Sequence, residues 1–488
     1  MENSKKSLQR YTIIIISLFC MFGFRLLPAP AGLSASGMQV IGVFIGVLLL
    51  WLTISIDWPS VLMLGALALV PELKFSAILS GAYGNSTFVF LMYTFVVTYA
   101  LSKTSFIKRT ALAFITSKIA SKGPWHFVTL YFASIIFIGC FISPTVLFFV
   151  YLPIVEEIYS LLKLEKGNKL AAMLMIGTVV MCGISSGMTP IAHVFPLIAL
   201  GLYQDMYGVA INYANFMTIA IPVGILCTIL SILVFKFILK PDMSSLKEFD
   251  THKISGIEGK VGTDEKIILG VFILVIALWI LPGLITPIIT TGPINSFFNW
   301  IDGFGTAMPP LIGLVLLCII QFNGKPLLSF SEAMSKGVSW PSLIMCASTL
   351  ALGSAITNAD IGLTTWLSNG LTPMIANLSP MIMVLIFTLW AAIQTNISSN
   401  MVTSTVVTAA ALAITASMTH VNIAGIVVNI GMMASYAFAT PPAMPCVAVA
   451  GSSGWTNTLQ MMKYGFIIMV LCVLVATFVG YPIANIIM

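Results

Sequence analysis

The chain has 488 residues, of which 59% are hydrophobic and 8% are charged, and its mean hydropathy is +1.04. No soluble domain of this size has such a composition, so the sequence predicts an all-α polytopic membrane protein. The net charge of +6 arises from basic residues in predicted loops, which indicates a topology signal and no nucleic-acid partner. The eight cysteines stand singly in apolar segments, so they predict neither a disulfide framework nor a metal site.

The apolar segments predict about 11 membrane spans, each roughly 17 to 25 residues long. In chain order they are 11–27, 38–56, 58–73, 87–103, a broken span at 168–204, 214–240, 265–287, 308–321, 340–357, a broken span at 422–455, and 463–487. The first segment could also be the apolar core of a signal peptide. An uncleaved first span with a cytoplasmic N-terminus is preferred, because many spans follow it. The sequence therefore predicts a multi-pass protein of the cell membrane.

Two stretches between the spans differ from the rest. Residues 104–122 carry basic side chains among apolar ones, which is typical of an amphipathic helix on the membrane surface. Residues 241–264 are the most polar stretch and predict a cytoplasmic linker. The predicted organisation is an N-terminal span in 1–37, a first repeat in 38–240, the linker, and a second repeat in 265–488.

Two segments, 124–162 and 374–417, are predicted to dip into the membrane and return to the same side as re-entrant hairpins. With both hairpins and a cytoplasmic N-terminus, all of the 22 basic residues except Lys74 and Arg25 face the cytoplasm. This agrees with the positive-inside rule, and the agreement is lost if either segment crosses. Length supports the second hairpin, because its apolar run 381–393 is too short to span.

An internal repeat is visible at a nearly constant offset. Residues 100–106 parallel 355–361, residues 143–145 parallel 399–401, and residues 189–190 parallel 440–441, at offsets of 255, 256 and 251 residues. Because each half holds five predicted crossings, the second half enters the membrane upside down. Inverted repeats with interrupted helices are typical of secondary transporters, whose substrate site lies between the repeats.

A polar segment lies within the longest charge-free run of the chain. Residues 361–462 contain no Asp, Glu, Lys or Arg, yet residues 394–400 read Gln-Thr-Asn-Ile-Ser-Ser-Asn. Unpaired polar groups in such a run cost several kcal/mol each, so this segment is predicted to bind a ligand. Together with residues 143–145 it would form one site.

Helix breaks are predicted at 183–190 and 435–442, next to the two hairpin tips. Pro144, Pro190 and Pro441 are expected to open new half-helices, because proline fits a first helical turn. Each half-helix N-terminus carries about half a positive charge, and no acidic residue is expected nearby, so the substrate is predicted to be an anion. His193 would be either a structural histidine or an additional cation or donor at the site.

At these residues the sequence resembles the divalent anion:sodium symporter family, the INDY-like carboxylate carriers. The resemblance rests on Ser399-Asn400 and on the segment 435–442, with its Thr440-Pro441 step, and on partial matches at 143–145 and 189–190. It extends over about residues 38–488. It implies a homodimer with scaffold and transport domains, elevator-like movement, and C4 to C6 di- or tricarboxylate substrates.

The resemblance also implies a set of site residues. The substrate-binding residues would be Ser143, Pro144, Thr145, Thr189, Ser398, Ser399, Asn400, Thr440 and Pro441. If sodium binds, its ligands would come from Ser143, Gly187, Asn400 and Ala439.

The chain departs from the family pattern at both tips. Position 144 is Pro instead of Asn, position 401 is Met instead of Thr, and Ala443 stands where Asn often follows the proline pair. Since sodium prefers oxygen ligands, the sequence favours sodium-independent dicarboxylate exchange over sodium-coupled symport, with no cofactor and no metal expected. An inorganic dianion permease of similar fold and a passive anion channel remain alternatives. A membrane enzyme is not expected, because the acidic residues form no metal-binding cluster.

Overall fold

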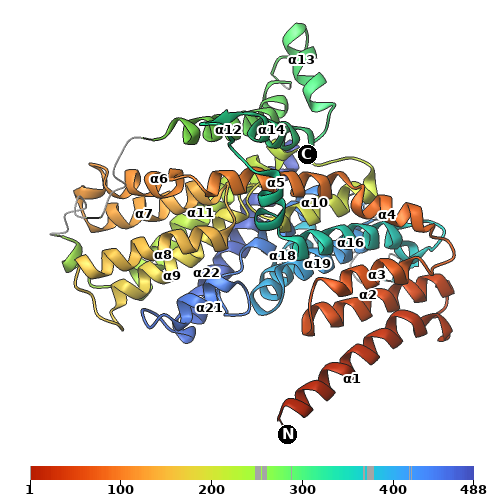
Figure 1. Cartoon of the computed structure of the whole chain (residues 1–488). Coiled ribbons are helices and arrows are strands. Elements are labelled where there is room, and N and C mark those ends of the chain that lie inside the picture. Colours follow the sequence, from red (N-terminus) through yellow and green to blue (C-terminus); the bar gives the residue numbers. More distant parts are fainter. Residues whose placement is uncertain are drawn as a thin grey trace.

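The computed structural model describes residues 2–247, 254, 261–286, 288–366, 369–370, 378–416, 418 and 420–488, with the side chains of 2–6 excepted. Within these residues the chain is almost entirely helical (Figure 1). Ten of the described helical segments are long and apolar enough to cross a membrane, which confirms an all-α polytopic membrane protein. Parts of the predicted linker (248–253 and 255–260) and of the second hairpin (374–377 and 417) lie outside the described residues.

The elements of the N-terminal part follow one another with short connections. They are α1 Glu2–Gly23, η1 Phe24–Leu26, α2 Ala35–Thr53, α3 Trp58–Leu67, α4 Phe75–Tyr83, α5 Ser86–Ser102, α6 Phe106–Ile115, η2 Ala120–Lys122, α7 Pro124–Gly139, α8 Pro144–Leu161, α9 Lys169–Ser186, α10 Val194–Tyr207, α11 Tyr213–Val234, the π-helical turn η3 Phe235–Leu239, and η4 Ser244–Leu246.

The C-terminal part contains the same kinds of element. They are α12 Thr263–Ile285, α13 Pro293–Asp302, α14 Met308–Ile319, β1 Gln321–Phe322, β2 Lys325–Pro326, α15 Phe330–Glu332, the π-helical turn η6 Ala333–Gly337, α16 Trp340–Thr357, α18 Pro380–Ile397, α19 Asn400–Thr415, α20 Ile423–Ser435, α21 Pro445–Ser452, α22 Thr458–Val475, the π-helical turn η7 Ala476–Gly480, and α23 Tyr481–Ile487.

Some predicted lengths were wrong. The spans expected at 58–73 and 308–321 contain the shorter helices α3 and α14, of 10 and 12 residues. Conversely, α18 extends four residues past the apolar run 381–393 and is long enough to cross a membrane. Length therefore does not identify the second hairpin, and its re-entrant character depends on the charge pattern. A small unpredicted β-hairpin joins β1 and β2 through Asn323 and Gly324, both at positive φ, as a tight Asn-Gly turn requires.

Loops predicted to lie outside the cell come together at one end of the molecule. The Ser34 hydroxyl donates to the carbonyl of Ile361 at 2.9 Å, and the Asn85 amide donates to the Asp205 carboxylate at 3.2 Å. These contacts join the starts of α2 and α5 to the ends of α16 and α10. They agree with the topology deduced from charge.

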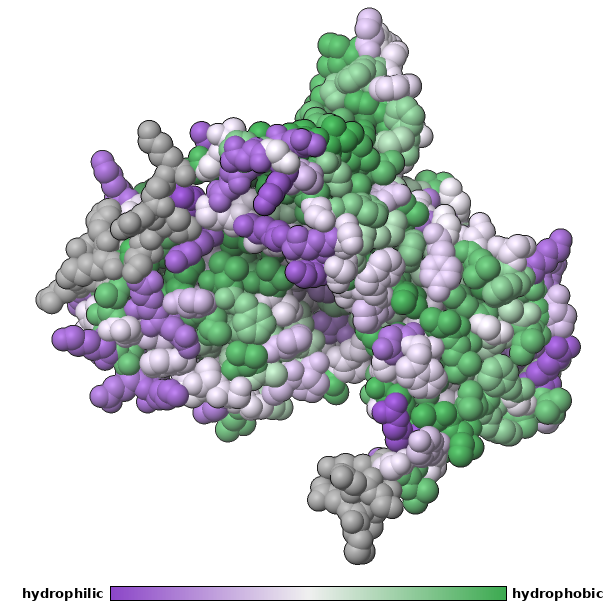
Figure 2. Space-filling view, viewed as in Figure 1, coloured by the Kyte–Doolittle hydropathy of each residue, from purple (hydrophilic) through white to green (hydrophobic). Residues whose placement is uncertain are grey.

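Loops predicted to be cytoplasmic meet at the opposite end. The Ser105 hydroxyl donates to the Glu265 carboxylate at 2.7 Å, and the Lys103 ammonium lies 2.7 Å from the Glu332 carboxylate. Figure 2 shows hydrophilic residues at the left and right edges of the molecule and also in the upper centre of this face, with hydrophobic surface between these patches.

The two halves repeat the same order of helix, hairpin, broken helix and long helix. In each half the second hairpin arm (α8 or α19) packs against the half-helix that follows the other half's break (α21 or α10). The long helices α11 and α22 each continue into a π-helical turn. Equivalent helices also have equivalent N-caps, which satisfy otherwise free backbone amides: Ser143 and Ser399, Asn168 and Asn422, and Asn212 and Asn457.

The breaks lie close to their predicted positions, but two prolines play a different part. Pro144 is the first residue of α8, as predicted. Pro190 and Pro441 lie inside the breaks, and the half-helices start later, at Val194 and Pro445. The prediction that Pro190 and Pro441 open half-helices was therefore wrong, because several residues of non-helical chain follow each of them.

Candidate anion-binding site

The first hairpin tip is tied to the first break by a hydrogen bond. Ser143 caps α8, with its side chain accepting from the Val146 amide at 3.5 Å. The Thr189 hydroxyl donates to the carbonyl of Cys140, the residue that follows α7. Thr189 is buried, so this hydroxyl serves the backbone of the tip.

The second hairpin tip has the same connection. Ser399 caps α19, accepting from the Val402 amide at 3.5 Å, and the Thr440 hydroxyl donates to the carbonyl of Asn396. Thr189 and Thr440 therefore occupy equivalent positions and hold each break against its tip. In the described structure both predicted substrate ligands use their hydroxyl for this connection.

Asn396 is a central residue that sequence reasoning missed. It is fully buried, and its side-chain oxygen accepts from the amides of Phe438 and Ala439 at 2.9 and 2.8 Å. Its side-chain NH₂ donates to the carbonyls of Tyr436 and Ala392 at 2.9 and 2.8 Å. All of its hydrogen-bonding groups are thereby engaged. Its presence in the polar segment 394–400 was a signal, but the adjacent Ser-Asn motif drew the prediction to Asn400.

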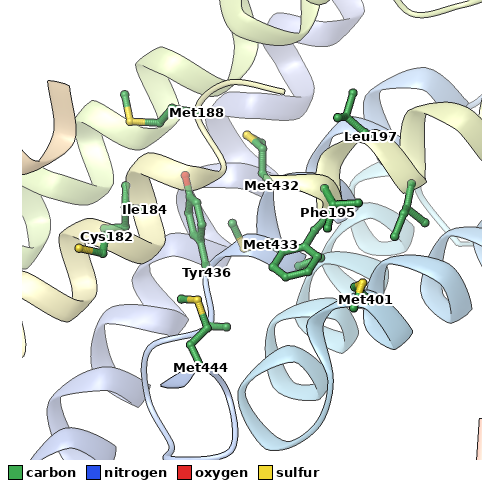
Figure 3. Close-up of a cluster of buried hydrophobic side chains, with 14 of the residues drawn as sticks. Cys182, Ile184, Met188, Phe195, Leu197, Met401, Met432, Met433, Tyr436 and Met444 are labelled. Carbon is green, nitrogen blue, oxygen red and sulfur yellow. The ribbon is translucent and has the colours of Figure 1, made fainter. Parts of the chain in front are cut away.

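The space between the two breaks is filled mainly by apolar side chains. Figure 3 shows Met188 near the first break, and Met433, Tyr436 and Met444 around the second. Gly187 allows this approach, because a Cβ there would lie 2.7 Å from the Tyr436 ring and 3.0 Å from the Met432 carbonyl. The two hairpin tips consequently do not share one cavity in this structure.

A cavity of about 500 Å³ lies beside the first tip. Three helices begin at its wall: α8, α10 and α21. The opposite wall comes from α5, η6 and the start of α16. The residues lining it are Phe95, Thr98, Tyr99, Ser102, Ile142, Ser143, Thr145, Val146, Ala192, His193, Val194, Lys336, Gly337, Val338, Ser339, Ser342 and Pro445.

The charge of this cavity suits an anion. Each helix N-terminus contributes about half a positive charge, so the three together supply about +1.5. Lys336 adds a positive charge that Glu332, 3.6 Å away, compensates in part. The Ser339 and Ser342 hydroxyls bond to each other at 2.8 Å, which leaves one of their two hydrogens free to donate, whereas the Thr98 hydroxyl already donates to the Thr94 carbonyl at 2.9 Å. None of the described lining residues is acidic. The sequence predicted that four half-helix termini converge; the structure brings three of them to the cavity.

His193 lies at this cavity as a neutral ring. Its Nδ1 accepts the amide hydrogen of Val194 at 3.0 Å, and the ring stacks on Phe195 with centroids 3.7 Å apart. A nitrogen that accepts a hydrogen bond carries no proton, so the remaining N–H is on Nε2. In this arrangement the Nε2–H of His193 can donate a hydrogen bond to an anion.

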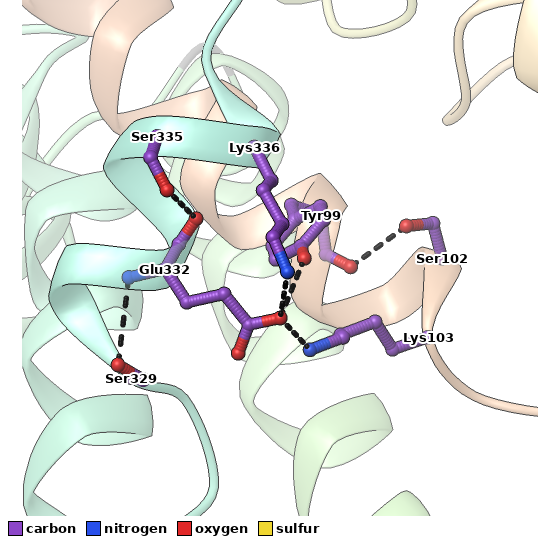
Figure 4. Close-up of polar contacts among 7 residues, drawn as sticks. All are labelled: Tyr99, Ser102, Lys103, Ser329, Glu332, Ser335 and Lys336. Carbon is purple, nitrogen blue, oxygen red and sulfur yellow. Dashed lines mark hydrogen bonds and ion pairs between the residues drawn. The ribbon is translucent and has the colours of Figure 1, made fainter.

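The cavity mouth carries a small ionic network (Figure 4). Glu332 accepts from the Tyr99 hydroxyl at 3.0 Å and lies 2.7 Å from Lys103 and 3.6 Å from Lys336. The hydrogen bond from Lys103 lowers the pKa of Glu332, and the same bond raises the pKa of Lys103. Sequence reasoning missed Lys336, because a lysine in a predicted loop has no pattern that places it at a membrane cavity.

The second tip holds a separate cluster of neutral oxygens. The single hydroxyl hydrogen of Thr395 is shared between the Ala434 carbonyl at 2.7 Å and the side-chain oxygen of Asn400 at 3.0 Å. The Ser398 hydroxyl is buried and has no hydrogen-bond partner among the described residues. None of Ser398, Asn400 or Thr440 lines the large cavity. The predicted residues thus divide into two groups, one at each tip.

Comparisons with known proteins place the chain among transporters. It matches the family described as the sodium:sulfate symporter transmembrane region over residues 6–488. It is 26% identical to the sodium-dependent dicarboxylate transporter SdcS of Staphylococcus saprophyticus, over 93% of this chain and 88% of the relative. Identity to SdcS of Staphylococcus aureus USA300 is 24%, over 94% and 88% of the two chains. The crystallised YdaH transporter of Alcanivorax borkumensis shares the fold with a TM-score of 0.54 at 12% identity, covering 84% and 87%.

Proposed function

Because this chain belongs to the sodium:sulfate symporter family of membrane transporters, we propose that it carries C4 and C5 dicarboxylates across the plasma membrane. The proposed substrates are the C4 and C5 dicarboxylates succinate, malate, fumarate and 2-oxoglutarate. Family membership confirms the expected resemblance and the expectation of a transporter over an enzyme. The observation that carries the proposal is the cavity in which three helix N-termini and Lys336 meet with no acidic lining residue.

The shape of the cavity favours a dicarboxylate over an inorganic dianion. Its volume of about 500 Å³ is in the range of small-molecule sites, and sulfate would fill little of it. Its positive groups lie on two walls, with the tip and half-helices on one and Lys336 on the other. A dicarboxylate has two separated charges that could meet both walls, with Ser143 and Thr145 supplying hydroxyl donors at the tip.

Sodium coupling is the mode of transport that the second tip supports. Among the described residues the buried Ser398 hydroxyl has no hydrogen-bond partner, and the Asn400 side-chain oxygen accepts from Thr395. Neutral oxygens of this kind suit a monovalent hard cation, and Ser398, Asn400 and the Ala439 backbone would hold it. Bound sodium would supply a positive charge near the substrate. The relatives named above are sodium-dependent, which supports the same mode.

Dicarboxylate exchange without sodium is the second candidate. It is favoured by the first tip, where Pro144 has no side-chain oxygen and Gly187 is packed tightly against Tyr436. The sequence favoured exchange because Pro144, Met401 and Ala443 stand where the family pattern has residues with side-chain oxygens. One coupling-ion site at the second tip, and none at the first, would reconcile both observations with sodium-coupled uptake.

The hydrogen bonds between tips and breaks suggest what moves. Thr189 and Thr440 join each tip to its break, and the Ser404 hydroxyl on α19 donates to the Phe195 carbonyl on α10 at 2.6 Å. We infer that the hairpins and broken helices move as one transport domain against a scaffold containing α5 and α16, in an elevator mechanism. The chain would act as a homodimer with its N-terminus in the cytoplasm. The projecting helix α13, with exposed Phe297 and Trp300, is available for the dimer contact (Figure 1).

Transport by purified protein in lipid vesicles tests the function and its coupling. Labelled succinate uptake is measured with and without an inward sodium gradient, and with and without internal 2-oxoglutarate. Sodium-coupled transport predicts uptake into vesicles that contain no dicarboxylate, only when sodium is present outside. Uptake that requires internal dicarboxylate and ignores sodium establishes exchange instead.

Competition tests the substrate class in the same vesicles. Excess unlabelled malate or fumarate should suppress succinate uptake, and excess sulfate should leave it unchanged. Strong competition by sulfate with none by malate would identify an inorganic dianion permease. Uptake that neither saturates nor shows counterflow would identify a channel.

A further inference from the structure

An apolar groove of about 410 Å³ runs along the first hairpin, between α7 and α11. Its rim includes Phe137 on α7 and Ile225 and Ile229 on α11, whose side chains are 47–48% exposed. Its floor includes Cys140 at the hairpin tip and Thr189 in the first break. The groove is therefore open on its outer side and ends on the backbone that shapes the anion cavity.

One turn of chain separates the groove from the anion cavity. Cys140 and Phe141 line the groove, whereas the next two residues, Ile142 and Ser143, line the cavity. The first break divides in the same way, with its first residues on the groove and its last residues on the cavity. Whatever fills the groove is in contact with the back of the first tip.

The chemistry of the groove excludes a polar occupant. None of its described lining residues is charged. Of its three threonines, Thr228 donates its hydroxyl to the Gly224 carbonyl at 2.9 Å and Thr189 donates to the Cys140 carbonyl, while Thr129 is an exposed residue of α7. A polar ligand or water there would lose hydrogen bonds that the groove does not replace.

The position of the groove identifies its occupant. The exposed isoleucines of α11 belong to a segment that is apolar and long enough to span the membrane, so the open side faces hydrocarbon. We propose that the acyl chain of a membrane lipid occupies this groove and supports the first hairpin tip from the side opposite the anion cavity. The acyl chain would make dispersion contacts with Cys140 and Met188, which these side chains would lose if the groove were an empty void.

Photocrosslinking in vesicles tests the binding site directly. The full-length protein is reconstituted with phosphatidylcholine that carries a diazirine in the middle of one acyl chain, and crosslinked peptides are identified by mass spectrometry. Crosslinks should concentrate on residues 129–141 and 217–232. Equal labelling of all lipid-facing helices would show only a general lipid contact and would overturn the proposal.

Groove-filling variants provide the matched comparison. Ile225→Trp should reduce crosslinking to the groove about tenfold, the loss expected when about two methylene groups of the chain are excluded. Ile273→Trp makes the same change at a 56% exposed position on α12 and should leave crosslinking to the groove unchanged. Ala133→Leu fills the groove from α7 and replaces Ile225→Trp if that variant does not fold. Undiminished groove crosslinking in a folded groove variant contradicts the proposal.

The coupling of the groove to the substrate rests on the proposed function, but the crosslink does not. Saturating succinate should change groove crosslinking in the wild type if the tip transmits occupancy, and unlabelled sucrose is the control solute. If succinate leaves groove crosslinking unchanged and succinate transport is intact, the idea that the lipid supports the first hairpin tip is refuted. The proposed transport function then still stands. Crosslinking between the α11 helices of two copies, with no lipid adduct, would show that a second copy of the chain occupies the groove. That result would overturn the proposal of a bound acyl chain.

Discussion

Replacing Asn396 with alanine should loosen the second break and abolish transport. The substitution leaves the amides of Phe438 and Ala439 and the carbonyl of Tyr436 without their partner in a fully buried region. Each buried group left unsatisfied costs about 1–3 kcal/mol, so the total is about 3 kcal/mol or more. This is a large part of the roughly 5–15 kcal/mol by which folded proteins are typically stable.

Thermal unfolding in detergent, followed with a thiol-reactive dye, measures this loss. Seven of the eight cysteines are buried, so the dye reports unfolding. The control is Thr388→Val on the same helix, α18, because the Thr388 hydroxyl is buried without a partner in the described structure and its removal should be neutral or stabilising. Succinate uptake is measured on both variants. A wild-type unfolding midpoint together with wild-type uptake for Asn396→Ala would refute this account of the break.

Four further outcomes are expected. Asn400→Ala should abolish sodium-stimulated uptake while the protein stays folded, as checked by size-exclusion chromatography; full residual uptake would remove the role of the second tip. Thr145→Ala should raise the KM for succinate about tenfold to a hundredfold, the effect of losing one hydrogen bond to a charged group, whereas a change in Vmax alone would argue against contact between Thr145 and the substrate. Lys336→Gln should raise the KM and weaken its dependence on ionic strength, and an unchanged salt profile would place the lysine outside the site. The pKa of Glu332 is lowered, so its ion pair with Lys103 is fully formed above the ordinary glutamate pKa of 4.5 and is lost as the pH falls through the lowered pKa. The pKa of Lys103 is raised, so the pair persists up to at least pH 10.5. Because neither group titrates near neutrality, Glu332→Gln should leave the shape of the pH–uptake profile there unchanged.

The departures from prediction share a physical origin. Pro190 and Pro441 have the rigid φ that suits a first helical turn, and local rules therefore placed half-helix starts there. In the structure the threonine before each proline is instead bonded to a hairpin tip far away in the chain. The helices consequently begin only after the chain has left that contact. Local preference was overridden by a tertiary hydrogen bond.

The residues that were missed have the same explanation. Asn396 lay inside the segment singled out as costly in lipid, yet three of its four hydrogen bonds go to residues of the second break that lie 40 to 43 positions away. Lys336 enters the cavity because η6 packs beside α5. Neither arrangement leaves a periodic pattern in the sequence.

The sequence by itself determined the membrane-embedded all-helical class, the family and the approximate positions of the breaks. These follow from composition, the rigid geometry of proline and the cost of polar groups in hydrocarbon, which depend on neighbouring residues. Only the tertiary structure decided that three helix N-termini share a cavity with Lys336, that Thr189 and Thr440 serve the hairpin backbones, and that the two tips stand apart. Those features depend on which distant surfaces pack together, and with apolar side chains filling the space between the breaks, packing placed the charge-binding groups beside the first tip.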